Sequence, residues 1–160
     1  MYRQVAEFEI QDKYICHCSG ACTAEEAFPG IQAQGAYAIS IHLLFPISSK
    51  YNCWRELAGA FFCVEGDAQA VEVFVPLLRG LGLQVQTISP ESKAQYHLSC
   101  ALASNFVCAL VQRSAELLGC CGFSQTDALH ALAPLMRSNL AHVIEHGAVS
   151  ALTGPIERGD

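Results

Sequence analysis

The stretch ESKAQYHLSCALASNFVCALV, residues 91–111, marks the point where the sequence pattern changes. Its apolar residues recur with helical spacing, which predicts a buried helix over residues 91–118. One side of this apolar helix nevertheless carries four polar groups: Lys93, His97, Ser104 and Asn105. Such groups either find partners within the core or face a cleft where chemistry takes place.

Ahead of this stretch, short apolar runs alternate with helical patterns. The predicted strands cover residues 13–20, 36–45, 59–66 and 83–89, and the predicted helices cover 23–35 and 67–82. Thr23 and Glu26 have the spacing of a capping box, and Asp67 is the expected N-cap of the second helix. This alternation indicates a mostly parallel α/β sheet.

From Pro90 onward the pattern is helical throughout. A second long helix is predicted over 124–146 with Ser124 as its N-cap, and a short helical tail reaches about residue 152. Pro134 is expected to kink this helix or to mark its boundary. The predicted fold class is α/β followed by all-α, with one domain in residues 1–89 and the other in residues 90–160.

The composition is that of a well-packed globular protein, since 52% of the residues are hydrophobic and 15% are charged. A net charge of −6 and a pI near 5.4 argue against nucleic acid or an anionic membrane as a partner. No uninterrupted apolar run reaches the ~18 residues of a membrane span, and the N-terminus is too polar for a signal peptide. The expected location is the cytoplasm.

Nine cysteines at irregular spacing do not match a secreted disulfide framework. The segment CHCSGAC, residues 16–22, offers three cysteines and His17 as metal ligands. Neighbours on a strand point to opposite faces, however, and no second ligand pair completes a tetrahedral set. We therefore expect no metal site, and we expect most of the cysteines to be small buried hydrophobes.

Helical geometry places Lys93, His97, Cys100 and Ser104 within roughly 40° of one another, with Asn105 roughly 80° from His97. A lysine and a histidine one turn apart lower each other's pKa, which suits proton transfer at neutral pH. Alternatively, Lys93 extends into solvent while His97 and Asn105 bond to the backbone. The spacing leaves both interpretations open.

Two further groups of residues are candidates for a site. Ser19 and Gly20 follow the first predicted strand and His42 lies near the end of the second, where ligands of open α/β sheets bind. The alternatives are an ordinary turn and a core histidine with its bonds satisfied. In the final segment ALTGPIERGD, Arg158 could clamp a carboxylate or phosphate, or the segment could be a solvated terminus.

Five stretches carry a resemblance to a known family: HCSGA, SIHLLFPIS, FFCVEGDAQA, SKAQYHLSCALASN and ALTGPIERGD. In order and spacing the chain resembles the Rossmann-type oxidoreductase-like proteins that carry the C-terminal domain of unknown function 2520. These are relatives of 6-phosphogluconate dehydrogenase, ketopantoate reductase and pyrroline-5-carboxylate reductase. The resemblance covers nearly the whole chain, although the usual family motif is closer to SIHPLQTF, so the sequence departs from it at Leu43.

The resemblance implies a partial Rossmann-like parallel sheet, a C-terminal helical domain and a substrate cleft between them. It implies NAD(P) as the cofactor of the full-length protein. It also implies that Lys93 or His97 donates a proton to a carbonyl or imine and that Asn105 orients the substrate. The remaining residues that it implies along the cleft are Ser19, Gly20, His42, Ser104, Thr153 and Arg158.

The chain lacks the Gly-rich phosphate loop of such proteins, because its GLG at 80–82 ends a predicted helix instead of opening one. The sequence is therefore expected to be an interior fragment, truncated at both ends. Two hypotheses follow. The chain is part of an NAD(P)-dependent oxidoreductase acting on a small carbonyl or hydroxy compound, or it is a non-catalytic helical module that forms a homodimer through its apolar helices.

Overall fold

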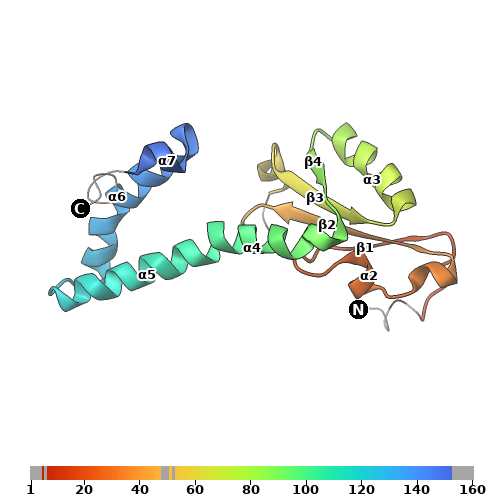
Figure 1. Cartoon of the computed structure of the whole chain (residues 1–160), viewed down its shortest axis with the longest axis horizontal. Helices are drawn as coiled ribbons and strands as arrows, with labels where there is room; N and C mark the ends of the chain where they lie inside the picture. The colour runs from red at the N-terminus through yellow and green to blue at the C-terminus, as the bar shows by residue number, and fades with distance from the viewer. Residues whose placement is uncertain (1–4, 6, 48–50, 52, 153–160) are drawn as a thin grey trace. The chain divides into compact units, whose positions relative to one another are not determined.

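The computed structural model describes residues 5, 7–47, 51 and 53–152 of the 160-residue chain (Figure 1). Thr153 and Arg158, two of the predicted cleft residues, lie outside the described residues. The chain forms two compact units, Met1–Ala101 and Leu102–Asp160. The domain boundary expected at residues 89 and 90 stays a prediction.

The first unit contains a four-stranded sheet in the order β1-β2-β3-β4. Its strands are β1 (Tyr14–His17), β2 (Tyr37–Leu44), β3 (Phe61–Gly66) and β4 (Gln84–Thr87). The pairs β1–β2 and β3–β4 are parallel, as expected of a mostly parallel sheet. The predicted class, α/β followed by helices, is confirmed.

The middle strand pair differs from the expectation of a parallel sheet, because β2 and β3 are antiparallel, with Ser40 opposite Glu65 and His42 opposite Cys63. The connection between them explains the difference. It contains only the short 3₁₀ helix η2 (Trp54–Leu57) among its described residues, whereas the crossover of a parallel pair usually contains an α-helix. The sheet is therefore mixed.

The two faces of the sheet are covered by different helices (Figure 1). Helix α3 (Ala68–Gly80) packs on one face, where Ile39, Val64, Ala70 and Val75 form a buried cluster. On the other face lie the short helix α2 (Ala24–Ala27) and the 3₁₀ helix η1 (Ile31–Gln34). Phe28 and Ile31 are central to the buried cluster on that side.

The segment predicted as one helix over 23–35 is divided into α2 and η1. Pro29 and Gly30 lie between the two, and Gly30 has a left-handed backbone with φ 69°. The predicted capping box is confirmed, because Thr23 Oγ1 accepts from the Glu26 amide at 3.1 Å and a Glu26 carboxylate oxygen accepts from the Thr23 amide at 2.8 Å.

The first long helix was expected to run without interruption over residues 91–118. Instead, the 3₁₀ turn η3 (Pro90–Ser92) leads into α4 (Lys93–Ala103), and α5 (Asn105–Cys120) begins after a break at Ser104. Ser104 has φ −123° and ψ −75°, outside the helical range. Serine and asparagine side chains compete with helical backbone bonds, which explains a break at this pair.

The second unit continues with α6 (Gln125–His146) and α7 (Ala148–Ala151). Ser124 is the N-cap of α6, as predicted, and its hydroxyl accepts from the Asp127 amide at 3.1 Å. Pro134 lies inside α6 and does not end it.

The expectation that most cysteines are buried is wrong. Six of the nine are exposed, Cys22 and Cys100 are half-buried, and only Cys63 is buried. The exposed cysteines lie mainly in or just after the edge strand β1, on α5 and in the turn that follows α5. Among the described residues no neighbouring element covers these positions, and the local sequence pattern cannot show this. All nine are free thiols.

The junction between β3 and α3 is fastened to β2 by Gly66 and Asp67. The Asp67 carboxylate accepts from the Ala38 amide at 2.6 Å, and the Asp67 amide donates to the Ala38 carbonyl at 2.9 Å. Asp67 is thus the N-cap of α3, as predicted, but its side chain binds β2 instead of the helix. Gly66 has φ 143°, and a Cβ there would lie 2.8 Å from the Ile39 Cα.

Substituting Gly66→Ala should lower the free energy of unfolding by about 2–5 kcal/mol, because it combines a strained φ with a backbone clash. Gly80→Ala is the matched control, since a Cβ at Gly80 meets nothing within 4 Å. The control should gain up to about 1 kcal/mol from helix propensity. Urea denaturation of both variants measures the difference, and equal stabilities would contradict the described junction.

Candidate active site

Lys93, the first residue of α4, is buried, with 1% of its side chain exposed. Its Nζ donates to Ser40 Oγ at 2.5 Å and lies 3.7 Å from Glu65 Oε1. The alternative that Lys93 extends into solvent is therefore wrong. Its predicted catalytic role stays a prediction.

The register of the sheet explains how these partners meet. Ser40 of β2 is paired with His17 of β1 on one side and with Glu65 of β3 on the other. Paired residues on adjacent strands project from the same face, so His17, Ser40 and Glu65 form one polar row across the sheet. We call these three residues with Lys93 the buried polar row.

Glu65 is held from two sides, since its Oε1 accepts from the Ala24 amide at 2.7 Å and lies near the Lys93 ammonium. Glu65 Oε2 and His17 Nε2 are buried and have no hydrogen-bond partner among the described residues. The other His17 nitrogen, Nδ1, accepts from the Ser19 amide at 3.1 Å. Burial, and then the nearby Lys93 charge, lower the pKa of His17, so its imidazole is neutral at pH 7.

A second group of side chains lies further along β2 and α4. His42 is two residues beyond Ser40, while Tyr96 and His97 follow Lys93 by about one helical turn. Two residues of a strand advance about 6.6 Å and one helical turn advances about 5.4 Å, so the two elements stay nearly in step. The Tyr96 hydroxyl lies 2.6 Å from His42 Nδ1.

His42 and His97 meet beside Gly20. A Cβ built on Gly20 would lie 2.8 Å from His42 Nε2 and 2.9 Å from His97 Nδ1, so both rings rest against the glycine. A larger residue would displace them, and this close approach gives Gly20 a specific role. The structure thus brings together three of the predicted site residues from three different elements.

Ser19 maintains the backbone turn that precedes Gly20. Its Oγ accepts from the Ala21 amide at 3.3 Å and from the Cys22 amide at 3.1 Å, and its carbonyl accepts from Ser40 Oγ at 3.4 Å. These contacts fit the turn interpretation of Ser19. Ser19 connects the turn to the buried polar row.

The surroundings of His42 and Tyr96 favour the uncharged form of both side chains. Burial lowers the pKa of His42, and the charges of Lys93 and His97 lower it further. Burial also raises the pKa of Tyr96, as do the neighbouring thiols of Cys63 and Cys100. At pH 7 the site therefore combines a neutral His42 and a protonated phenol near a buried lysine.

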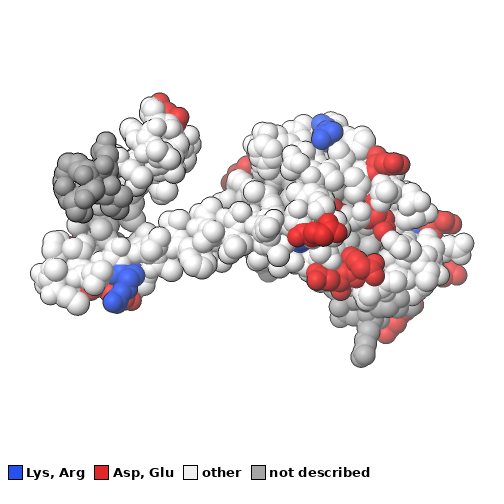
Figure 2. All heavy atoms as spheres, in the orientation of Figure 1, with Lys and Arg blue, Asp and Glu red and all other residues white. Residues whose placement is uncertain are grey.

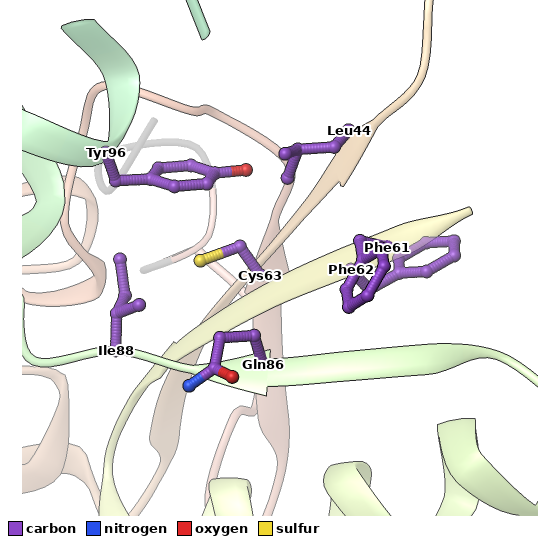
Figure 3. A pocket seen from close by; sticks show the side chains of 7 residues that line it. All are labelled: Leu44, Phe61, Phe62, Cys63, Gln86, Ile88 and Tyr96. Carbon is purple, nitrogen blue, oxygen red and sulfur yellow. The ribbon is translucent and has the colours of Figure 1, made fainter. Parts of the chain in front are cut away.

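A shallow apolar hollow lies on the other side of Tyr96, over β3 and β4. Figure 3 shows the phenol of Tyr96 above the Cys63 thiol, with Ile88 and Gln86 along the wall. The remaining lining residues are Leu44, Phe61 and Phe62. Tyr96 is shared by this hollow and by the contact with His42.

Two predicted site residues belong to the second unit. Ser104 Oγ and Asn105 Oδ1 lie 3.3 Å apart at the start of α5, and both side chains are exposed. Their predicted part in the site stays a prediction, as do the parts of Thr153 and Arg158. Among the described residues, no group of three or more His, Cys, Asp or Glu side chains could hold a metal ion.

Three residues of this region, Ser40, Glu65 and Tyr96, were not predicted from the sequence, and neither was the burial of His17 in the polar row. A usable signal exists for two of them. Ser40 and Glu65 are polar residues inside strands that are otherwise apolar, and Ser40 shares its strand face with His42 because of the two-residue period. Two such residues on different strands indicate a shared polar partner in the core.

Solved structures resemble this chain in fold. Protein TM1727 from Thermotoga maritima, known from a crystal structure, is 27% identical with a TM-score of 0.72, and the match covers 91% of this chain and 55% of that one. "Putative NADP oxidoreductase BF3122" from Bacteroides fragilis is 18% identical with a TM-score of 0.66, covering 92% and 53%. The chain spans about half the length of both structures. It shares its fold with both of them.

The family is shown by a match over residues 60–160 to the model described as "Domain of unknown function (DUF2520)". The chain belongs to this family, which confirms the resemblance found in its sequence. No curated protein matches the chain.

Substituting Lys93→Met should lower the free energy of unfolding by about 3–5 kcal/mol, because it leaves the Glu65 carboxylate buried without its counter-ion. The double variant K93M/E65Q should recover part of this loss, since the amide that replaces the carboxylate carries no charge. Urea denaturation followed by circular dichroism measures both changes.

Arg79→Met is the control within the same unit. Arg79 is exposed and bonds only weakly to the Val85 carbonyl at 3.4 Å, so its loss should cost no more than about 1 kcal/mol. A K93M variant as stable as R79M would mean that the buried pair does not hold α4 on the sheet.

Proposed function

We propose that this chain forms the substrate-side part of an NAD(P)-dependent oxidoreductase that acts on a small carbonyl or hydroxy compound. The observation that carries the proposal is the meeting of His42 Nε2 and His97 Nδ1 beside Gly20. Membership of the family and the oxidoreductase-like fold support it. The site follows the carboxyl end of β1, where ligands of α/β sheets bind.

In this proposal the two imidazoles act on the oxygen atom of the substrate. His97 is exposed and can exchange protons with solvent, which makes it the proton donor when a carbonyl is reduced to an alcohol. His42 is half-buried and neutral, so it orients the same oxygen by a hydrogen bond. A nicotinamide cofactor, when bound, supplies the hydride to the carbonyl carbon.

For Lys93 we propose a role other than the proton donation that the resemblance implies. Its Nζ is 1% exposed and already bonded to Ser40, so direct proton delivery from it would require the buried pair to separate. We propose that Lys93 positions α4, and with it Tyr96 and His97, and that its charge keeps His42 neutral.

The residues of this chain do not fit the pyrophosphate of a dinucleotide. No Gly-x-Gly-x-x-Gly stretch occurs in the sequence, and the glycines at 80 and 82 belong to the end of α3. We therefore propose that a segment outside this sequence binds the phosphates.

All nine cysteines are free thiols, which supports a cytoplasmic location.

Reduced nicotinamide mononucleotide tests the proposal, because it presents the nicotinamide without requiring a dinucleotide phosphate site. We expect saturable shifts of the His42 and His97 ring signals in NMR spectra, with a dissociation constant on the order of 1 mM, or about −4 kcal/mol. Gly20→Ala, which displaces both rings, should weaken binding several-fold.

His130 and His142 on α6 serve as internal controls, since both are exposed and belong to the second unit. Their signals should not move. Ring signals of His42 and His97 that stay unchanged up to about 20 mM ligand, well above a millimolar dissociation constant, would refute a nicotinamide site here.

A second candidate function is supported by the surface of the helical unit. Large apolar side chains are exposed along α5 and α6, and Figure 2 shows few charged side chains over these helices. The exposed apolar residues include Phe106, Leu110, Leu117, Leu135, Leu140 and Ile144. A patch of this kind marks an interaction surface, and we propose that a second copy of the chain covers it.

A lipid bilayer is the competing way to cover apolar surface. The stretch Pro90–Cys120 is long and apolar enough to cross a membrane by length and composition alone. However, Lys93 near its start is bound to Ser40 and Glu65 of the sheet, and the helix breaks at Ser104. These contacts favour a protein partner over lipid.

Sedimentation equilibrium should show a dimer of this 17.3 kDa chain. Leu110→Glu should shift it to monomers, because a carboxylate in an apolar interface loses hydration without gaining a partner. Leu81→Glu is the matched control: Leu81 is 69% exposed and Leu110 is 67% exposed, but Leu81 belongs to the first unit. A monomeric wild type, or equal effects of both variants, would contradict dimerisation through α5 and α6.

A further inference from the structure

Tyr96 has no role in the proposed reaction, yet it makes the closest side-chain contact to His42. Its hydroxyl lies 2.6 Å from His42 Nδ1, and the two rings meet edge to face with centroids 5.6 Å apart. Both side chains are half-buried, and they come from β2 and α4, which the buried polar row holds together. This contact is therefore fixed by the fold.

The direction of this hydrogen bond follows from the chemistry around the phenol. A neutral tyrosine has a single proton to donate, and its neighbours are His42 and the thiols of Cys63 and Cys100. Burial raises the pKa of Cys63, so this thiol keeps its own proton. A thiol sulfur is a weak acceptor compared with an imidazole nitrogen. The phenol proton therefore goes to His42 Nδ1.

A neutral imidazole that accepts at Nδ1 carries its proton on Nε2. His42 Nε2 is the nitrogen that lies against Gly20, on the side of His97. Among the described residues, the groups that face His42 are Lys93, Tyr96 and His97 from α4 and Cys63 from β3, and the positive charge of Lys93 disfavours a second one on His42. This described set includes no carboxylate that would stabilise an imidazolium.

We propose that Tyr96 is a positioning residue that holds His42 in the Nε2–H tautomer, so that His42 presents a hydrogen-bond donor beside Gly20. The group that this donor suits is an oxygen acceptor, such as the carbonyl oxygen of a substrate. The part concerning the substrate rests on the proposed function. The tautomer itself is a property of the free protein and is measurable without any ligand.

Nitrogen-15 NMR of the histidine rings in the free chain at about pH 7.5, above the ordinary histidine pKa of roughly 6.5, measures this tautomer. In the wild type, the His42 signals should show a protonated Nε2 and an unprotonated Nδ1 shifted by an accepted hydrogen bond. Tyr96→Phe removes only the hydroxyl, so the Nδ1 signal should move toward that of the exposed His130. Tyr37→Phe is the control and should leave His42 unchanged.

A protonated Nδ1 on His42 in the wild type would overturn the proposal, because the bond would then run from His42 to Tyr96. So would a Y96F variant whose His42 signals match the wild type. These outcomes are separate from a failure of the nicotinamide titration, which would remove the substrate but leave the tautomer in place. If Y96F does not fold, the wild-type spectrum still decides the direction of the bond.

Discussion

The burial of one ammonium group organises the first unit of this protein. Lys93 brings a positive charge to the face of the sheet, and the sheet receives it with the Glu65 carboxylate and the Ser40 hydroxyl. Removing such charges from water costs several kcal/mol each, so the arrangement persists only where the partners are in place. Because Ser40 and Glu65 lie on paired strands, the contact fixes α4 to both β2 and β3 at once.

The contact of Lys93 with the sheet also determines where the rest of α4 lies. The pitch of a helix and the two-residue repeat of a strand are similar in length, so residues one turn after Lys93 lie over residues two positions after Ser40. Tyr96 consequently meets His42, and both His42 and His97 reach Gly20. The candidate site is thus a consequence of where the buried charge is held, although Lys93 itself is shielded from solvent.

The second unit differs from the first in how much apolar surface it leaves exposed. Its helices α5 and α6 bury little of their apolar surface, and only Ala115 and Ala128 are buried among its described residues. Exposing this much leucine side chain to water is unfavourable in free energy, and covering it with apolar surface is favourable. The chain spans about half the length of the two solved structures that it resembles.

The sequence by itself determined the class of fold, the approximate position of each strand and long helix, the Thr23 capping box and the family. These features depend on local periodicity and on short motifs, which a linear sequence retains. It also identified Lys93 and His97 as candidates, because they are polar residues in an apolar helix, and Gly20 and His42, because they lie at the ends of predicted strands. Only the tertiary structure decided that β2 and β3 are antiparallel, that Lys93 is bonded to Ser40 and Glu65, and that Tyr96 holds His42. Each of these depends on partners brought together from separate strands and helices, and no local pattern specifies which distant residues will meet.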